Sequence, residues 1–596
     1  MKRISTPANI ILLLVLSFTT IRLDSQELTP AAHASNNLEY FQVSPWEEIY
    51  LHIDRDKFIA GEDIWFSIFT IDMETEKLSA RSAVAYIELL NPWNMPVIQT
   101  RLQLADGRGE GNFVFPDSLS SGTYTIRAYT NWMKNFLPDN CYMNDIEIFN
   151  PFRNSDFRRK EGLNNNLRIK EIVTQQKKGT MVTLTADSIF GRREKVTFKF
   201  GTGNYNERQS SIYDLSISVT RAKVSERSQG IENYILSRQT GWEDILSKVK
   251  FPPIYSFESV GHYLSVIVKY REGNVSDSAN YINMSIQGKV AEFRYAGRDA
   301  AGRFTFILPV DSKFRNLILQ PEHANNNIIL EIEPSFSWIL PVSNSFKDTL
   351  SDSQLDLFSE LSFNYQAAKI YATRLKKEAG SDDNSSPKKR RFYGIPEMEV
   401  FLDEYISLPT MQEVFFELLP GIILRSRKSE YEMRITNPLT GIFYDEPPLV
   451  MIDGVIINDL TVLVNLNPET VEKIEVVKTP YLIGDHILHG IVNVITLQGN
   501  FSEITMPDYA VILPYRVIDK PPTISVPDYS DEQNKLNRTP DLRNTLYWNP
   551  SLKTGMTGEA EIQFWTSDLP GKYIVNIQGI SGTGEKVSLY KSFRVR

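Results

Sequence analysis

The sequence predicts a mainly β protein, in which tandem antiparallel β-sandwiches are combined with one compact α+β unit. Two observations predict the sandwiches: short runs of β-branched and aromatic residues are separated by turn residues, and one Gly-marked strand pattern recurs. A third observation predicts the α+β unit, because helical and strand periodicities alternate over residues 392–499. The composition is globular, with 42% hydrophobic and 23% charged residues, and the length corresponds to about three to six domains.

The N-terminus has the pattern of a secretory signal peptide, which we assign to residues 1–26. A basic start at residues 1–3 precedes an apolar stretch over residues 10–21, which is shorter than the ~20 residues of a spanning helix. Cleavage is expected near Ser25 or after Ala34, and an N-terminal membrane anchor is the alternative. No cysteine follows closely, so a cysteine-linked lipid anchor is not expected.

The first sandwich is expected over residues 40–150. Four runs there are rich in β-branched and aromatic residues, and the turn pairs Ala60-Gly61, Asn91-Pro92 and Asp106-Gly107 separate them. Short strands at this spacing are typical of an antiparallel sandwich. The four predicted strands are 48–53, 64–70, 83–89 and 122–129.

One strand pattern occurs twice in full. Gly109 and Tyr124 enclose the first copy, and Gly558 and Tyr573 enclose the second copy at the same spacing. A partial third copy begins at Gly302. We interpret the pattern as a repeated hairpin, with chance similarity between hairpins as the alternative.

The rest of the chain is divided by changes of pattern. The linker ends in Lys388–Arg391, and because the net charge of the chain is −9, we interpret these four cations as solvated rather than as a site for acidic lipid or nucleic acid. The predicted parts are a second sandwich (160–250), a third, regulatory-like sandwich (251–345), a helical segment and polar linker (350–391), the α+β unit (392–499) and a C-terminal sandwich-like segment (500–596).

The α+β unit has clear local signals. Thr410 and Glu413 have the spacing of a capping box at the start of a helix. Asp453-Gly454 lies between two apolar runs and predicts a tight turn, for which turn geometry alone is a sufficient reason. Strands are expected over residues 473–478 and 490–496.

Two segments resemble known families. Residues 50–66, with Asp54-Arg55, Phe58 and Gly61-Glu62, resemble the opening of a bacterial macroglobulin-type domain, which implies an immunoglobulin-like sandwich. Gly122 to Tyr129 with Trp132-Met133 fits this resemblance, and residues 545–550 with Tyr573 resemble another strand set of the class.

Residues 392–499 are similar to the plug domain of TonB-dependent outer-membrane receptors. The resemblance is carried by residues 448–455, 466–478, Gly484 and 490–496, but the family's Arg-Gly-Ala stretch is replaced by residues 485–489. In the family, the plug fills a β-barrel of about 22 strands. The 97 residues after Gly499 (596 − 499) are too few for such a barrel, so we expect a plug-like domain without one.

No catalytic, cofactor-binding or metal-binding residue is predicted. The six histidines, His33, His52, His262, His323, His486 and His489, are scattered. His486 and His489 follow Asp485, but a loop without a third cluster does not indicate a metal site. Cys141 lacks the nearby Gln of a macroglobulin thioester and is interpreted as a small core residue.

The remaining polar and aromatic candidates also have structural explanations. Asp54-Arg55 is expected to be a local ion pair that organises the first strand, and Asp56 is not assigned a role in acid–base chemistry. Trp46, Trp93 and Trp132 could form sugar or peptide platforms, but core and edge packing is the preferred interpretation.

These observations favour an exported, non-enzymatic binding or assembly protein of a Gram-negative envelope, located in the periplasm or at the periphery of the outer membrane. Its expected partner is an outer-membrane β-barrel or another envelope protein, with no nucleic acid and no cofactor. The plug-like domain would dock on that partner, in TonB-dependent uptake or outer-membrane assembly. The alternatives are a macroglobulin-like protease-binding or inhibitor module, and a structural envelope protein.

Overall fold

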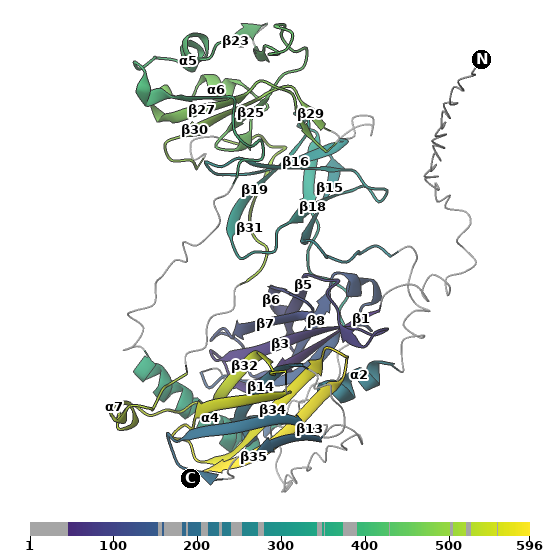
Figure 1. Ribbon diagram of the computed structural model, residues 1–596, viewed down its shortest axis with the longest axis vertical. Helices are drawn as coiled ribbons and strands as arrows, with labels where there is room; N and C mark the ends of the chain where they lie inside the picture. The colour runs from purple at the N-terminus through teal and green to yellow at the C-terminus, as the bar shows by residue number, and fades with distance from the viewer. Residues whose placement is uncertain are drawn as a thin grey trace, which may run out of the picture. The chain divides into compact units, whose positions relative to one another are not determined.

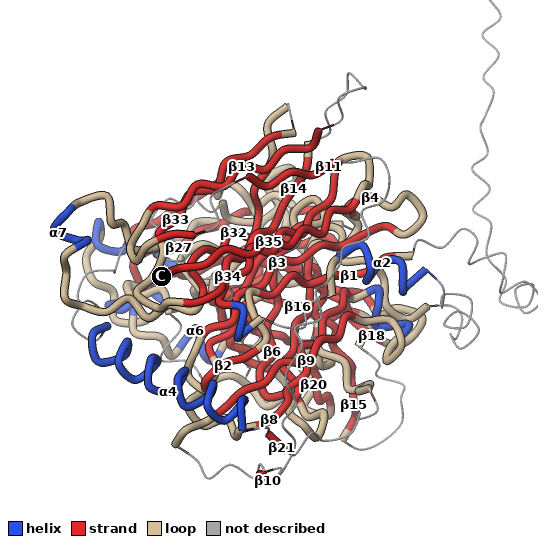
Figure 2. Tube along the Cα trace, turned by 90° about the horizontal axis from the view of Figure 1, so that it is seen from below, coloured by secondary structure: helices blue, strands red, loops and turns tan. Residues whose placement is uncertain are grey.

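The computed structural model describes most of the chain from Trp46 onward (Figure 1). Strands dominate the described chain and the helices are few (Figure 2), so the mainly β fold class with tandem sandwiches is confirmed. The predicted signal peptide and Asp485 lie outside the described residues. Those residues are 46–152, 158–159, 181–185, 189–203, 212–225, 229–239, 253–271, 279–341, 349–350, 352–372, 390–427, 430–484, 486–500, 505–519, 526–556 and 558–596.

The first sandwich is formed by strands between Glu47 and Phe149, and its two sheets enclose one apolar core. One sheet has the order β1-β3-β4 with β7 also paired to β3, and the other has the order β2-β9-β8-β5-β6. Only β2 and β9 pair in parallel within these two sheets. The strands are β1 (Glu47–Ile53), β2 (Lys57–Ile59), β3 (Asp63–Asp72), β4 (Lys77–Leu78), β5 (Val84–Leu90), β6 (Pro96–Gln103), β7 (Arg108–Val114), β8 (Gly122–Thr130) and β9 (Tyr142–Phe149).

The second sandwich is assembled from two segments that lie far apart in the sequence. Its sheets have the orders β11-β13-β33 and β12-β35-β34-β14-β32, and Figure 1 shows β13 and β14 beside the yellow strands of the C-terminus. Residues 160–250 and 500–596 were predicted as separate sandwiches, and the sheet pairing corrects this. The strands are β11 (Met181–Thr185), β12 (Ile189–Phe190), β13 (Lys195–Gly203), β14 (Tyr213–Arg221), β32 (Thr545–Lys553), β33 (Glu559–Trp565), β34 (Gly571–Ser581) and β35 (Lys586–Val595).

The first two sandwiches have the same topology. The orders β2-β9-β8-β5-β6 and β12-β35-β34-β14-β32 correspond strand by strand, and the edge strand is parallel in both cases. The antiparallel pair β14–β32 therefore corresponds to the hairpin β5–β6. Residues 222–544 occupy the place of the short β5–β6 turn, which explains why one sandwich begins and ends so far apart in the chain.

The third sandwich is also completed by a strand that returns late. Its sheets have the orders β18-β15-β20 and β17-β16-β19-β31, around a separate apolar core. The predicted range 251–345 therefore lacks β31, which follows the α+β unit. The strands are β15 (His262–Tyr270), β16 (Tyr281–Ile286), β17 (Glu292–Gly297), β18 (Arg303–Leu308), β19 (Phe314–Pro321), β20 (Ile328–Ile332) and β31 (Val511–Arg516).

The α+β unit spans residues 390–500 and contains a five-stranded sheet in the order β22-β27-β30-β25-β26. Asp453 and Gly454 have φ angles of 48° and 75°, as the predicted tight turn between β25 and β26 requires. The Thr410 hydroxyl accepts a bond from the Glu413 amide, as predicted for the helix cap. The elements are β22 (Met398–Phe401), η4 (Leu402–Glu404), α5 (Met411–Leu418), β23 (Ile422–Arg427), β24 (Glu430–Ile435), β25 (Leu449–Ile452), β26 (Val455–Ile456), α6 (Thr461–Val464), η5 (Pro468–Thr470), β27 (Val471–Val477), β28 (Tyr481–Ile483), β29 (His486–Leu488) and β30 (Ile491–Thr496).

The repeated Gly pattern is a crossing between sheets and not a hairpin. In each copy, the Gly turn sends the chain into the opposite sheet, at β7, β18 and β33, and the next strand returns. In the two full copies, the returning strand carries a tyrosine whose hydroxyl donates to a carbonyl four residues upstream. These bonds are Tyr124 Oη to Ser120 O (2.8 Å) and Tyr573 Oη to Leu569 O (2.9 Å), the arrangement known as a tyrosine corner.

The remaining described elements connect the sandwiches. The predicted helix after residue 352 forms as α4 (Asp352–Ala372), whose Phe358 ring stacks on Phe149 of the first sandwich at 5.0 Å. α2 packs on β35, and its Tyr234 ring lies 5.5 Å from that of Tyr50 on β1. The other elements are η1 (Trp132–Phe136), β10 (Arg158–Arg159), η2 (Ala222–Val224), α2 (Ile231–Gln239), β21 (Thr349–Leu350) and α7 (Glu532–Lys535).

Candidate functional site

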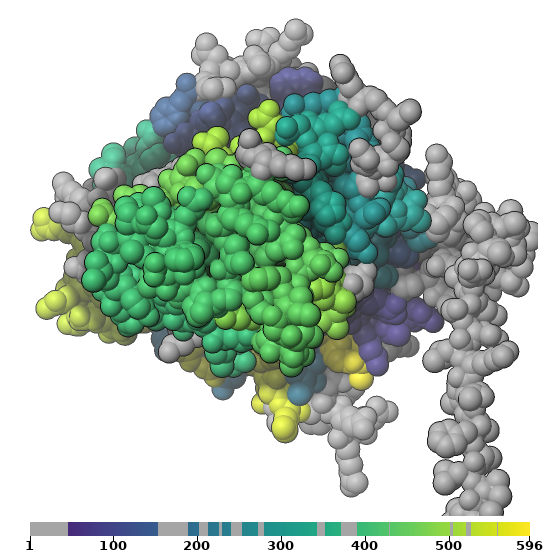
Figure 3. All heavy atoms as spheres, turned by 90° about the horizontal axis from the view of Figure 1, so that it is seen from above, coloured from purple at the N-terminus to yellow at the C-terminus, as the bar shows by residue number. Residues whose placement is uncertain are grey.

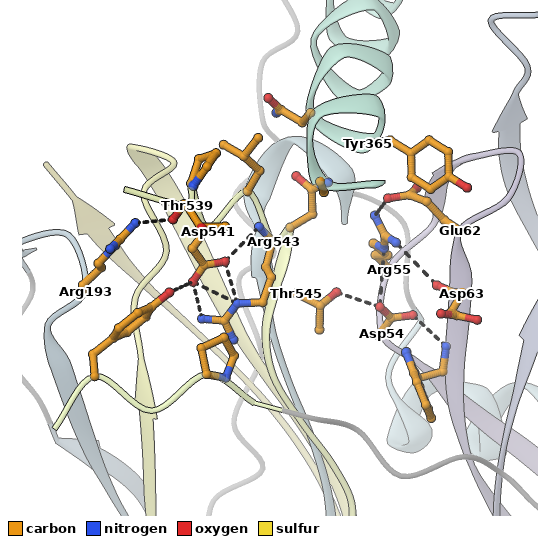
Figure 4. A pocket seen from close by; sticks show the side chains of 18 of the residues that line it. Asp54, Arg55, Glu62, Asp63, Arg193, Tyr365, Thr539, Asp541, Arg543 and Thr545 are labelled. Atoms are coloured by element: carbon orange, nitrogen blue, oxygen red, sulfur yellow. Dashed lines mark hydrogen bonds and ion pairs between the residues drawn. The ribbon is translucent and has the colours of Figure 1, made fainter. Parts of the chain in front are cut away.

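A pocket of about 620 Å³ is lined by the turn before β3, by α4 and by the segment that leads into β32 (Figure 4). Gly61 allows α4 to approach this turn. Its φ angle is +93°, and a Cβ there would lie 2.2 Å from both Tyr365 Oη and Asp117 Oδ1. Only glycine satisfies both the left-handed backbone and this close contact.

On one side of the pocket, the predicted Asp54-Arg55 pair is part of a larger cluster. Arg55 Nε lies 3.4 Å from Asp54 Oδ2, and Arg55 Nη1 donates to Glu62 Oε1 at 3.2 Å. The Asp54 carboxylate also accepts bonds from the Trp65 amide and the Thr545 hydroxyl. Burial raises the pKa of Asp54 to about 6, against the opposing effects of Arg55 and these hydrogen bonds. The predicted local ion pair therefore forms, but it organises the start of β3 and not the first strand.

On the other side, two arginines fix the segment before β32. Arg193 forms a two-bond ion pair with Asp568 and also donates to carbonyls of residues 534–539. Arg543 forms bonds from Nε and Nη2 to Asp541, whose Oδ2 also accepts the Tyr529 hydroxyl. Arg193 has a φ angle of 50°, so its backbone adopts the left-handed conformation that Gly61 adopts at the equivalent turn.

The charged side chains of these two clusters therefore form ion pairs with one another. Each of the three guanidinium groups, on Arg55, Arg193 and Arg543, has a carboxylate partner within 3.4 Å. A buried ion pair is costly to break because one charge would remain without compensation. This pocket is best understood as a structural joint between the two sandwiches and α4, with Asp54 and Arg55 in the local ion pair that the sequence predicts.

A second buried cluster, which sequence reasoning missed, joins the first and third sandwiches. His262 Nδ1 lies 3.0 Å from Glu258 Oε1, and His262 Nε2 lies 2.6 Å from Tyr515 Oη. The Tyr86 hydroxyl of the first sandwich donates to the same Glu258 carboxylate. His262 and Glu258 are fully buried, and burial lowers the pKa of His262. The cluster links β5, β15 and β31 through buried His262 and Glu258 and partly buried Tyr515, so it acts as an interdomain clamp.

The remaining histidines among the described residues do not converge, and His33 lies outside the described residues. His52 lies between the first two sandwiches, where Nδ1 is 2.7 Å from Ser216 Oγ. His486 contacts the rings of Tyr281 and Tyr295 in the third sandwich, whereas His489 Nδ1 lies 3.5 Å from Glu446. His323 is exposed. Across the described residues, no three His, Cys, Asp or Glu side chains are grouped in a way that suits a metal ion.

The other residues singled out in the sequence have mainly structural positions. Cys141 is buried, burial raises the pKa of its thiol to about 12, and Sγ donates to the Pro138 carbonyl. Trp132 is buried and stacks on Phe257 at 4.5 Å, and Trp46 Nε1 donates to Glu48. Trp93 is the exception among the three tryptophans, because its side chain is exposed.

The α+β unit exposes a set of four large apolar side chains. Its residues come from the loop before α5, from α5 and from the turn after β24, and their exposed fractions are 90% for Ile406, 82% for Phe416, 85% for Leu439 and 70% for Ile442. These four residues are called the α5 surface below. The face of the unit seen in Figure 3 has no other described part of the chain covering it. Isolated exposed apolar residues are common, but a group of them marks candidate interaction sites.

The opposite side of the unit is fixed on the third sandwich. The Gly288 amide donates to Asp453 O at 2.9 Å, the Gln320 side chain donates to Ile456 O at 3.0 Å, and Phe293 packs 5.4 Å from Phe392. The β28–β29 hairpin also contacts this sandwich, because a Cβ on Gly484 would lie 1.9 Å from Tyr295 Oη. The α5 surface is therefore one exposed apolar region of the unit, beside the separately exposed Ile395, Leu482, Ile487 and Leu497.

Comparisons with known proteins do not assign the chain to a family. No protein-family model matches it, and no curated protein matches it. α2-Macroglobulin of Salmonella, reacted with methylamine, aligns over 92% of this chain and 39% of its own, with 8% identity and a TM-score of 0.23. α2-Macroglobulin of Escherichia coli, activated by porcine elastase, aligns over 92% and 44%, with 9% identity and a TM-score of 0.24.

A third structure, the CARDB domain of the PF1109 protein from Pyrococcus furiosus, aligns over 18% of this chain with 10% identity and a TM-score of 0.14, and 94% of that domain is covered. The chain thus spans about two fifths of the length of the macroglobulins. Because the TM-scores are this low, the fold assignment rests on the sheet topology described above. Among the described residues, no helix has the length and apolarity needed to cross a membrane.

Proposed function

We propose that this chain is a non-enzymatic binding or assembly protein of the Gram-negative cell envelope, exported to the periplasm or the outer-membrane periphery. Its sandwiches act as a scaffold, and its α+β unit is the docking piece for an outer-membrane β-barrel or another envelope protein. The likeness of residues 392–499 to receptor plugs and the signal-like N-terminus motivate the choice of partner and compartment.

The observation that carries this proposal is the asymmetry of the α+β unit. One side is held by the third sandwich through backbone and side-chain hydrogen bonds, and the opposite side exposes four large apolar side chains. An apolar residue on a rigid support loses little conformational entropy when it binds, because its surroundings are already ordered. This arrangement supports a role for the unit in presenting a surface to a partner.

Charge around the α5 surface indicates what its partner offers. The exposed side chains of Asp403, Glu404, Glu413 and Glu417 lie on or beside η4 and α5. An apolar centre with an acidic rim fits a partner whose apolar site is bordered by Lys or Arg, since complementary charge speeds encounter and excludes wrong partners. The proposal thus favours a protein partner with a basic rim over an acidic lipid surface.

Affinity capture from solubilised envelopes tests the proposed function. The full chain is expected to retain one envelope protein, and the double variant Phe416→Asp/Leu439→Asp is expected to lose it. Leu536→Asp is the matched control, because Leu536 is 78% exposed but lies beside α7, far from the unit in sequence. Retention of the same protein by the double variant would refute the α5 surface as the docking site.

A further inference from the structure

A second pocket, of about 540 Å³, lies where the third sandwich meets the α+β unit. Its walls are β17 and β18 of the sandwich, together with Arg390, Phe392 and Ile483 of β28. The volume is within the range of small-molecule sites, which is roughly 300–1,000 Å³. Four aromatic rings line it, from Phe293, Tyr295, Phe306 and Phe392.

The walls of this junction pocket are held in place by hydrogen bonds and ring contacts. The Phe392 amide donates to Ala291 O at 3.0 Å, and the Phe392 ring lies 5.4 Å from that of Phe293. Arg294 Nη1 donates to Ile307 O at 2.9 Å, which connects β17 to β18 across one side. The pocket is therefore a preformed feature of the junction, and a ligand would not need to order it.

The arginines of the junction pocket have fewer hydrogen-bond and ion-pair partners than the arginines of the larger pocket. Within the described part of the chain, the exposed Arg390 guanidinium has no hydrogen-bond or ion-pair partner, and Arg294 is bonded to a single backbone carbonyl. Arg55, Arg193 and Arg543 in the larger pocket are all paired with carboxylates. Glu292 is the one acidic side chain in the junction pocket, so the lining carries two cations against one anion.

We propose that the junction pocket binds a monocarboxylate with an apolar body. The Arg390 guanidinium pairs with the carboxylate, a geometry that can form two parallel hydrogen bonds. The aromatic rings and the side chains of Ile307 and Ile483 contact the apolar body. A fatty acid and the C-terminus of an apolar peptide share this chemistry. The site is separate from the α5 surface, so the binding of such a ligand stands independently of the proposed docking function.

Isoleucine-methyl NMR on the full chain tests this inference. Decanoate is the probe, and the Ile307 and Ile483 methyl signals are expected to shift with saturation, whereas decylammonium should leave them in place. Arg390→Gln is expected to weaken decanoate binding by about tenfold or more, because a charge-assisted pair is lost. Arg271→Gln, on an exposed arginine of the same sandwich, is expected to bind like the unaltered chain.

A tetrapeptide with a free apolar C-terminus and its C-terminal amide distinguish the two sources of the carboxylate. Saturable shifts with the free peptide and not with the amide would assign the site to peptide ends, and shifts with decanoate alone would assign it to fatty acids. The inference is overturned if neither carboxylate shifts the two methyl signals, if decylammonium shifts them equally, or if Arg390→Gln binds decanoate unchanged.

Discussion

The Thr545 hydroxyl, on the first residue of β32, donates a 2.7 Å hydrogen bond to the Asp54 carboxylate, 491 residues earlier in the chain. This bond joins the first sandwich to the strand with which the chain returns to the second. Between the two halves of the second sandwich, the chain builds the third sandwich and the α+β unit. The α+β unit is thus inserted in the third sandwich, which is itself inserted in the second sandwich. Strands on both sides of each insertion belong to the same surrounding sandwich.

The divided second sandwich predicts energetic coupling between distant residues. Phe198 on β13 and Phe564 on β33 stack with centroids 6.0 Å apart in one core. Each change to Ala is expected to cost about 3–5 kcal/mol, and the double variant is expected to differ from the sum by about 0.5–3 kcal/mol. Denaturant unfolding measures this, and Phe198→Ala with Phe306→Ala in the third core is the additive control. Additivity of the first pair would contradict a shared core.

The two tyrosine corners predict matched losses of stability. Tyr573→Phe removes the donor to the buried Leu569 carbonyl and should cost about 1–3 kcal/mol, because that carbonyl is left without its partner. Tyr124→Phe removes the equivalent bond to Ser120 and should have a similar cost. The free energies of unfolding of the two variants test the repeat directly. A large loss in one variant and none in the other would show that the copies are not equivalent.

His52 predicts a defined pH dependence. Burial, with a smaller effect of Arg108, lowers the pKa of His52 to about 3, so the folded state holds the neutral ring while the unfolded state binds a proton near pH 6.5. The contribution of neutral His52 to the free energy of unfolding is therefore fully present above pH 6.5. It is lost as the pH falls toward 3, by up to about 1.4 kcal/mol per pH unit. Between pH 6.5 and 4, His52→Gln should flatten the slope of unfolding free energy, and the exposed His323→Gln should not. Equal slopes for all three proteins would contradict this assignment.

The turn at Gly454 predicts a specific effect on the contact between the α+β unit and the third sandwich. A Cβ there would meet the Ile286 carbonyl at 3.1 Å and the Ala291 Cα at 3.3 Å, whereas a Cβ on Gly441 would meet nothing within 4 Å. Both glycines have φ angles near +70° to +75°, so Ala adds similar backbone strain at each. Gly454→Ala should therefore raise hydrogen exchange in β16 and β17 more than Gly441→Ala does. Equal exchange would mean that the contact with the third sandwich is loose.

Local features of this fold could be predicted from the sequence, because they depend on neighbouring residues. The turn at Asp453-Gly454, the cap at Thr410 and the cluster around Asp54-Arg55 all formed as expected. The division of the second sandwich could not be predicted, since a strand pattern shows which face is buried but not which strand pairs with it. Residues 181–221 and 545–595 each supply four strands, and these eight strands correspond to those of the first sandwich without β4.

The candidate sites could be predicted from the sequence pattern even less well than the fold could. Arg390 was interpreted as one of four solvated linker cations, and its place beside Phe392 and β17 follows from tertiary packing that no local spacing encodes. The same is true of Tyr515, which reaches His262 only because β31 returns to the third sandwich. The plug-like character of residues 392–499 remains a prediction from sequence resemblance.

Crosslinking in living cells from the α5 surface tests the central proposal most directly. A photoreactive residue at Phe416, and separately at Leu439, is expected to capture the same envelope protein, while one at Val114, which is 62% exposed on β7, captures none. Absence of a protein adduct from both α5 positions, or capture of the same protein from Val114, would contradict the docking role of the α+β unit.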